Sequence, residues 1–127
     1  MGKKVCIDTD ILINALKDPA YYARIRHQFS GYEAYSTTIT VFELYKRKTN
    51  IDKVHFIMSQ LQVLEFDTAC AVTAANIFKN ITAKGINMDY RDLFIAAIAL
   101  AHECVLLTNN FKDFKNVPNL RLENVKD

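Results

Sequence analysis

The stretch VCIDTDILIN, residues 5–14, decides the fold of this chain. Residues 5–7 are apolar and mainly β-branched, which predicts a short buried strand. The apolar side chains after Asp8 recur at helical spacing, which predicts that a helix follows at once. An acidic residue between a buried strand and a helix lies in the crevice where open α/β sheets bind ligands. The stretch therefore predicts the first strand and helix of an α/β domain, with a candidate site at their junction.

Two carboxylates, Asp8 and Asp10, flank this junction. Asp and Thr before a helix commonly act as caps, because their side chains accept hydrogen bonds from free backbone N–H groups. Helix capping and metal binding are therefore equally compatible with this stretch taken alone.

The composition indicates one soluble domain. The chain has 127 residues, of which 50% are hydrophobic and 24% charged, and this suits a single core over residues 1–127. The longest apolar run, residues 93–101, is about half of the ~20 residues that a membrane helix needs. Asp8 and Asp10 would interrupt any signal-peptide core, so we expect a cytoplasmic protein.

The three cysteines, Cys6, Cys70 and Cys104, lie far apart in apolar segments without a C-x-x-C pair. This spacing suggests neither a disulfide framework nor a zinc site, and it favours reduced core residues. The three histidines share no ligand spacing either. A net charge of +2 is compatible with nucleic-acid binding only if the basic residues cluster.

The remaining chain alternates short β-branched runs with longer helical patterns. Helices are expected near 20–29, 41–48, 53–61, 68–84 and 90–103, and strands near 34–36, 63–66, 105–107 and 120–125. The helix at 90–103 is apolar nearly all round, so we expect it to be central. This alternation predicts an α/β domain with a largely parallel sheet.

Acidic or amide side chains stand at four boundaries between elements: Asp8 with Asp10, Glu43, Asp92 with Asp89 before it, and Asn110 with Asp113. The carboxyl ends of parallel strands meet at one edge of a sheet, so these side chains are expected to converge there. Converging carboxylates without a matching buried cation repel one another. Mg²⁺ would relieve this repulsion, because it takes oxygen ligands and supports phosphoryl transfer.

Each of these positions also has a structural explanation. Glu43 precedes Lys46 and Arg47 at spacings that favour a helix surface ion pair. Asp92 follows the cap residue Asp89 by three positions and would favour the helix dipole, yet it shares a face with apolar side chains, where an unpaired carboxylate is costly. Asn110 and Asp113 are both common turn residues.

Four motifs together resemble the PIN-domain ribonucleases, in particular the VapC-like toxins of prokaryotic toxin–antitoxin pairs. They are IDTDILI at 7–13, TVFEL at 40–44, DLFIAAIA at 92–99, and LTNNFKDF at 107–114 followed by Val117-Pro118. The resemblance covers nearly the whole chain. It implies a three-layer α/β/α sandwich with a short central sheet, and a Mg²⁺- or Mn²⁺-dependent endoribonuclease that leaves 3′-hydroxyl and 5′-phosphate ends.

The resemblance also implies roles for individual residues. Asp8, Glu43 and Asp92 would be the metal ligands, with Thr9 and Thr108 orienting the carboxylates or the attacking water by hydrogen bonding. The family's fourth acidic position falls on Asn110, an amide, so a second metal would need Asp10 or Asp113. We favour Asn110 acting through a bound water, with Asp113 capping a turn before Phe114.

Partners follow from the same resemblance. Basic side chains at Lys46, Arg47 and Lys48, placed on the helix of Glu43, and at Lys112 and Lys115 are candidates for gripping RNA phosphates, although a solvated surface is an equal alternative. A VapB-like antitoxin and a homodimer are expected. Exposed members of the set Tyr21, Tyr22, Phe29, Phe42 and Tyr45 would mark an interface.

Two other functions compete with this one. A D-x-D phosphatase or phosphotransferase would use Asp8 as a phosphorylated nucleophile and Asp10 as an acid, but Leu12 replaces its hydroxyl residue and no later Asp-Asp pair exists. A non-catalytic module could keep the fold and bind RNA or protein. Only an activity assay separates it from the nuclease.

Overall fold

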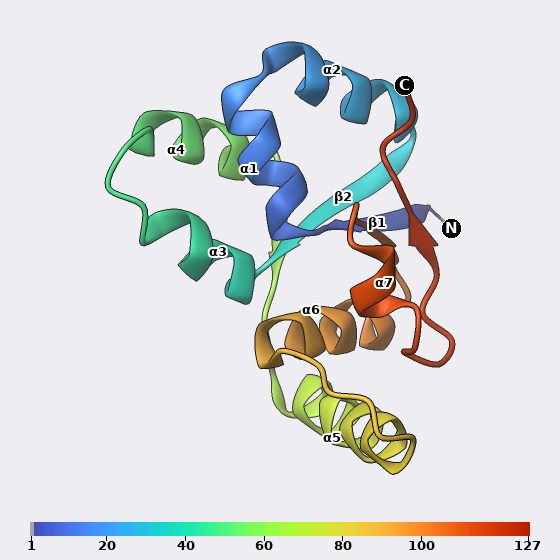
Figure 1. Cartoon of the computed structure of the whole chain (residues 1–127). Helices are drawn as coiled ribbons and strands as arrows, with labels where there is room; N and C mark the ends of the chain where they lie inside the picture. Colours follow the sequence, from blue (N-terminus) through green and yellow to red (C-terminus); the bar gives the residue numbers. More distant parts are fainter. Residues whose placement is uncertain (1) are drawn as a thin grey trace.

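The computed structural model describes residues 2–127 and contains one five-stranded sheet with the order β3-β2-β1-β4-β5 (Figure 1). The strands are β1 (Lys3–Ile7), β2 (Tyr32–Thr37), β3 (Gln62–Leu64), β4 (Val105–Leu107) and β5 (Leu122–Glu123). All four pairings are parallel, and Val5 in the central strand β1 pairs with Ala34 of β2 and Val105 of β4. The prediction of a largely parallel sheet is confirmed.

Within residues 2–127 the helices are α1 (Thr9–Lys17), α2 (Pro19–Gln28), α3 (Thr38–Tyr45), α4 (Ile51–Ser59), α5 (Thr68–Ala83), α6 (Tyr90–Ala101) and α7 (Phe111–Phe114). Helices α1 to α4 lie on one side of the sheet and α5 and α6 on the other (Figure 1). The structure is therefore the three-layer α/β/α sandwich that the resemblance implied.

Alternation along the strands divides the core in two. Val5 and Ile7 of β1 pack with helices α1, α2 and α4, whereas Cys6 between them packs with α5 and α6. Successive strand side chains point to opposite faces, so one short apolar strand serves both layers. Helix α6 buries every residue from Ile95 to Ala99, which confirms its expected central position.

Several boundaries differ from the sequence expectation. Helix α3 begins at Thr38 because Thr37 is already a cap, its Oγ1 accepting from the N–H of Thr40 at 3.1 Å. The same helix ends at Tyr45, so the prediction that Lys46–Lys48 lie on it is wrong. Helix α4 begins at Ile51, after Asn50 adopts a left-handed backbone with φ of 61°. Strand β5 has only two residues.

The surface shows which of the candidate interface aromatics are exposed. Of the five aromatic residues considered for an interface, Phe42 has 64% of its surface exposed, whereas Phe29 is buried in the core and Tyr21, Tyr22 and Tyr45 are partly buried. Phe56, which the sequence did not single out, is also exposed. Among the helices in residues 2–127, none combines the length and apolar character needed to cross a membrane.

Candidate functional site

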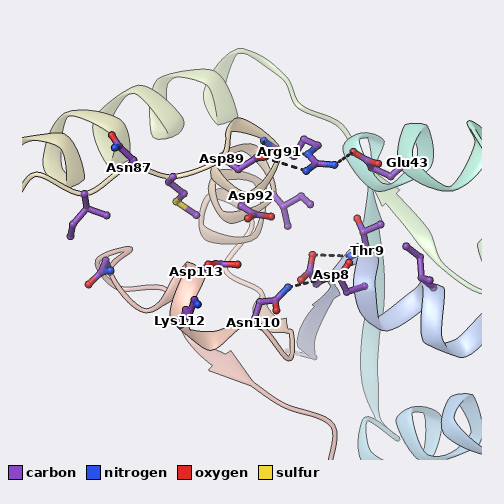
Figure 2. A pocket seen from close by; sticks show the side chains of 16 residues that line it. Asp8, Thr9, Glu43, Asn87, Asp89, Arg91, Asp92, Asn110, Lys112 and Asp113 are labelled. Carbon is purple, nitrogen blue, oxygen red and sulfur yellow. Dashed lines mark hydrogen bonds and ion pairs between the residues drawn. The ribbon is translucent and has the colours of Figure 1, made fainter.

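A cavity of about 500 Å³ opens at the carboxyl edge of the sheet, where α1, α3 and α6 begin (Figure 2). Nine of the residues expected at the site line it: Asp8, Thr9, Asp10, Glu43, Asp89, Asp92, Asn110, Lys112 and Asp113. Thr108 lies beneath it, bonded to Asp8. The basic residues Lys46, Arg47, Lys48 and Lys115 are not part of its wall. The topology therefore gathers the acidic residues as the parallel sheet required.

Asp8 is both a cap and a wall of this pocket. It follows β1 directly, only 3% of it is exposed, and its Oδ1 accepts from the N–H of Thr9 at 2.8 Å. Its Oδ2 accepts from the Thr108 hydroxyl at 2.8 Å. Burial raises the pKa of Asp8 to about 6 although the Thr108 hydrogen bond opposes the shift, and the charge of Asp10 raises it further. Capping and a site role are thus compatible in one residue.

Asp92 faces Asp8 across the pocket from the first turn of α6 (Figure 2). Asp89 caps this helix by accepting from the N–H of Arg91 at 2.8 Å, which leaves Asp92 free to point inward. Burial raises the pKa of Asp92 to about 6, and the negative charge of Asp8 adds to the effect. The expectation that Asp92 turns toward the interior is met.

Glu43 is the third carboxylate, and its surroundings are different. Only 9% of it is exposed, yet it forms ion pairs with Lys46 at 2.8 Å and with Arg91 at 3.0 Å. The hydrogen bond from Lys46 lowers the pKa of Glu43 most, and that from Arg91 lowers it further. The helix ion pair considered from the sequence exists with Lys46, but not with Arg47, whose buried Nε has no hydrogen-bond partner in residues 2–127.

Arg91 is the site residue that the sequence argument missed. The assumption that no cation matches the converging carboxylates is wrong at Glu43, because the Arg91 guanidinium reaches it from α6. The available signal was a cation standing between two expected site residues, Asp89 and Asp92. Its partner Glu43 is 48 residues away in the chain, so only the fold brings them together.

The loop before α7 closes the other side of the pocket. Asn110 donates through Nδ2 to Asp10 Oδ2 at 2.7 Å, and its backbone N–H donates to Thr108 Oγ1 at 3.0 Å. Asp113 lies inside α7, whose cap position is Asn110, and it lines the pocket. The preference for Asp113 as a turn cap is therefore not supported by its placement.

Thr9 contacts Asp8 through its backbone and not through its side chain. The Thr9 hydroxyl bonds to the Thr40 hydroxyl at 2.8 Å, whereas the Thr9 N–H donates to Asp8. The Thr108 hydroxyl does bind a carboxylate oxygen. A backbone donor and a side-chain donor together fix the Asp8 carboxylate in one orientation.

The donor set fits a hard divalent cation. Six carboxylates and two cations, Arg91 and Lys112, line the pocket. Across residues 2–127, none of the ion pairs involves Asp8 or Asp92, so their charges are left without a partner. Oxygen ligands with uncompensated negative charge are what Mg²⁺ or Mn²⁺ requires.

A second group of possible ligands lies elsewhere. Asp67, Cys70 and His102 offer ligand atoms within 4.8 Å of one another, although sequence spacing suggested no such cluster. Asp67 caps α5 by accepting from the N–H of Cys70 at 3.0 Å, and the Cys70 thiol donates to the Glu65 carbonyl at 3.6 Å. These hydrogen bonds account for Asp67 and Cys70 without a metal, and none of the three residues lines the acidic pocket.

Comparison with known proteins agrees with this architecture. Residues 5–120 match the family model described as PIN domain. "Ribonuclease VapC2" of Rickettsia felis is 31% identical over 127 residues, covering 93% of this chain and 95% of that protein. "tRNA(fMet)-specific endonuclease VapC" of Salmonella typhimurium is 28% identical and covers 94% and 96%.

A solved structure extends the likeness to three dimensions. The crystal structure of VapBC2 from Rickettsia felis, bound to a DNA fragment from their promoter, superposes with a TM-score of 0.87. It is 28% identical and covers 97% of this chain and 99% of that one. The chain belongs to the PIN-domain family, and its relatives within that family are VapC ribonucleases.

Proposed function

We propose that this protein is an endoribonuclease that hydrolyses RNA phosphodiester bonds and serves as the toxin of a type II toxin–antitoxin pair. The observation that carries the proposal is the convergence of Asp8, Glu43 and Asp92 on one pocket, in a chain whose relatives are named ribonuclease VapC. Those relatives do not favour the D-x-D phosphatase. Asp10, the acid in that alternative, is engaged by Asn110.

The proposed metal ligands are Asp8, Glu43 and Asp92, and the proposed cofactor is Mg²⁺ or Mn²⁺. When bound, such an ion lowers the pKa of water and offsets charge on the leaving oxygen. Thr108 and the Thr9 N–H hold the Asp8 carboxylate in place, and Asn110 restrains Asp10 on the same rim. The products of such hydrolysis would carry 3′-hydroxyl and 5′-phosphate ends.

The pocket also contains groups that suit the RNA backbone. Lys112 lines it and is exposed, so it is the better placed of the basic residues considered for phosphate binding. Lys46 lies beside Glu43 with half of its side chain exposed. Lys48 and Lys115 are exposed outside the pocket and would act only on RNA that extends beyond it.

The proposed partners are a VapB-like antitoxin and a second copy of this chain. Six carboxylates give the pocket a negative potential that an antitoxin Arg or Lys would complement. The exposed Phe42 and Phe56 are the type of side chain found in protein interfaces. Sedimentation at micromolar concentration would test the homodimer. The cytoplasm is the proposed compartment, because all three cysteines are free and buried.

Removal of the pocket charges tests the proposed activity. Asp8→Asn and Asp92→Asn each keep side-chain volume while deleting a ligand charge, so each should lower RNA cleavage at least about 100-fold. Asp52→Asn is the matched control, because Asp52 is exposed on α4 away from the pocket. Cleavage of labelled RNA with and without Mn²⁺ provides the measurement. Full activity in either pocket variant would refute the proposal, and the absence of activity in the wild type would favour a non-catalytic module.

A further inference from the structure

Both oxygens of the Glu43 carboxylate are already engaged by cations. Oε2 lies 2.8 Å from Lys46 Nζ, and Oε1 accepts from Arg91 Nη1 at 3.0 Å. Asp8 and Asp92, by contrast, take part in none of the ion pairs in residues 2–127. Glu43 would therefore bind a metal ion while it already contacts two cations, whereas Asp8 and Asp92 would bind it without such contacts.

Arg91 is held in this position from its other side. Its Nε and Nη2 atoms donate to the two oxygens of Asp89, each at 3.3 Å, while Asp89 also caps α6 through the Arg91 N–H. The guanidinium thus spans from the start of α6 to Glu43 on α3 (Figure 2). A planar fork with fixed donor directions can make these contacts simultaneously, which an ammonium group cannot.

Lys46 does not provide the same link. It lies three residues after Glu43 on the same segment, and about half of its side chain is exposed. Because both partners lie on one segment, this ion pair does not connect Glu43 to another helix. Among the hydrogen bonds and ion pairs of residues 2–127, the Arg91 contact is the one that joins Glu43 to the helix that carries Asp92.

A divalent cation at Glu43 would lie close to the Arg91 charge. Like charges repel at that separation, and the carboxylate oxygen would have to be shared or released. We propose that Arg91 is a positioning residue that holds Glu43 toward α6 in the metal-free protein and competes with the divalent cation for its carboxylate. This inference rests on the proposed function, since it takes Glu43 as a ligand.

Metal affinity tests the competition without reference to activity. Calorimetric titration of the metal-free full chain with Mn²⁺ should show about two- to fivefold tighter binding by Arg91→Gln, the range expected from losing one exposed ion pair. Arg91→Lys keeps the charge and should stay closer to the wild type. Lys112→Gln is the matched control, because it removes a pocket cation that forms none of the ion pairs in residues 2–127.

The same titration in the Glu43→Gln background isolates the contact. Tightening by Arg91→Gln should disappear there, because the shared carboxylate is gone. Unchanged or weaker Mn²⁺ binding by Arg91→Gln, while Glu43→Gln alone weakens it, overturns this inference and leaves the proposed function standing. Wild-type Mn²⁺ affinity in Glu43→Gln overturns both the inference and the proposed ligand set. If Lys112→Gln tightened Mn²⁺ binding equally, the cause would be the overall charge of the pocket rather than competition at Glu43.

Discussion

Asp8 and Glu43 line the same pocket and are both buried, yet their pKa values shift in opposite directions. Burial raises that of Asp8 to about 6, whereas Lys46 and Arg91 lower that of Glu43. The neighbours of Asp8 are a hydroxyl and an amide N–H, which orient the carboxylate without neutralising it. Burial therefore dominates at Asp8 and cationic partners dominate at Glu43, which leaves Asp8 as the carboxylate without a cation of its own.

The largest expected effect is the pH dependence of the free energy of unfolding that Asp8 and Asp92 cause. Both pKa values are raised from 3.8 to about 6, so between these limits the folded chain binds more protons than the unfolded chain. The free energy of unfolding of the metal-free protein should therefore fall as pH rises through this window, by about 2 kcal/mol from pH 5 to 7, since solvent screening reduces the contribution of the half-buried Asp92. Urea unfolding in EDTA measures it.

Stabilisation of the protein by a bound metal should depend on pH in the opposite direction. Mn²⁺ needs both carboxylates ionised, so the rise in melting temperature that it causes should shrink as pH falls below about 6. Asp8→Asn provides the control, because it should retain only the contribution of Asp92 to the pH dependence. If Asp8 and Asp92 instead made the free energy of unfolding of the metal-free protein rise from pH 5 to 7, the contrast with Glu43 would be contradicted.

The next effect is a difference in the sign of the stability change between two amide substitutions, Asp8→Asn and Glu43→Gln. Asp8→Asn should stabilise the metal-free protein by about 1–2 kcal/mol at pH 7.5, since it removes an unpaired buried charge. Asn is as good a helix cap as Asp, and the Thr108 hydroxyl can turn to accept from its amide. Glu43→Gln should instead destabilise by a few tenths of a kcal/mol, because it ends two partly exposed ion pairs. Equilibrium unfolding in EDTA that gave both variants the same sign would remove the distinction.

The smallest expected effect concerns Asp113, which lines the pocket from α7 and is exposed. Because its placement is not that of a cap, Asp113→Asn should change the free energy of unfolding by less than about 0.5 kcal/mol. If it supports a second metal, the same change should lower the cleavage rate, and Asn110→Asp should raise Mn²⁺ affinity. Unchanged rate and affinity in both variants would leave the site with the Asp8, Glu43 and Asp92 ligands alone.

The sequence contained enough information for the layers and for the deep carboxylates. A β-branched strand followed by an acidic helix start, and an apolar helix carrying Asp92, are local patterns whose meaning follows from sheet topology. The start of α3 could not be located from the sequence, because three of the residues 37–40 are threonines and each could cap a helix. The backbone of the folded chain selects Thr37. Local competition between similar caps leaves such boundaries open.

The contacts of the pocket that join distant parts of the chain were beyond local patterns. The Arg91 side chain is long and exposed, so its choice of partner depends on where α3 lies relative to α6. The same holds for Asn110 and Asp10, which lie 100 residues apart and meet only through the pairing of β1 with β4. Their roles follow from tertiary placement and not from residue type.

The central position of β1 has a consequence for the timing of synthesis. β1 is made before its partner β4, and the Thr108 hydroxyl that holds Asp8 lies 100 residues further along the chain. Chains emerge from the ribosome from the N-terminus, and contacts that close long loops form late. A nascent chain therefore carries Asp8, then Glu43 and finally Asp92 before the pocket can be assembled. A competent site can form only after β4 and Thr108 have been synthesised.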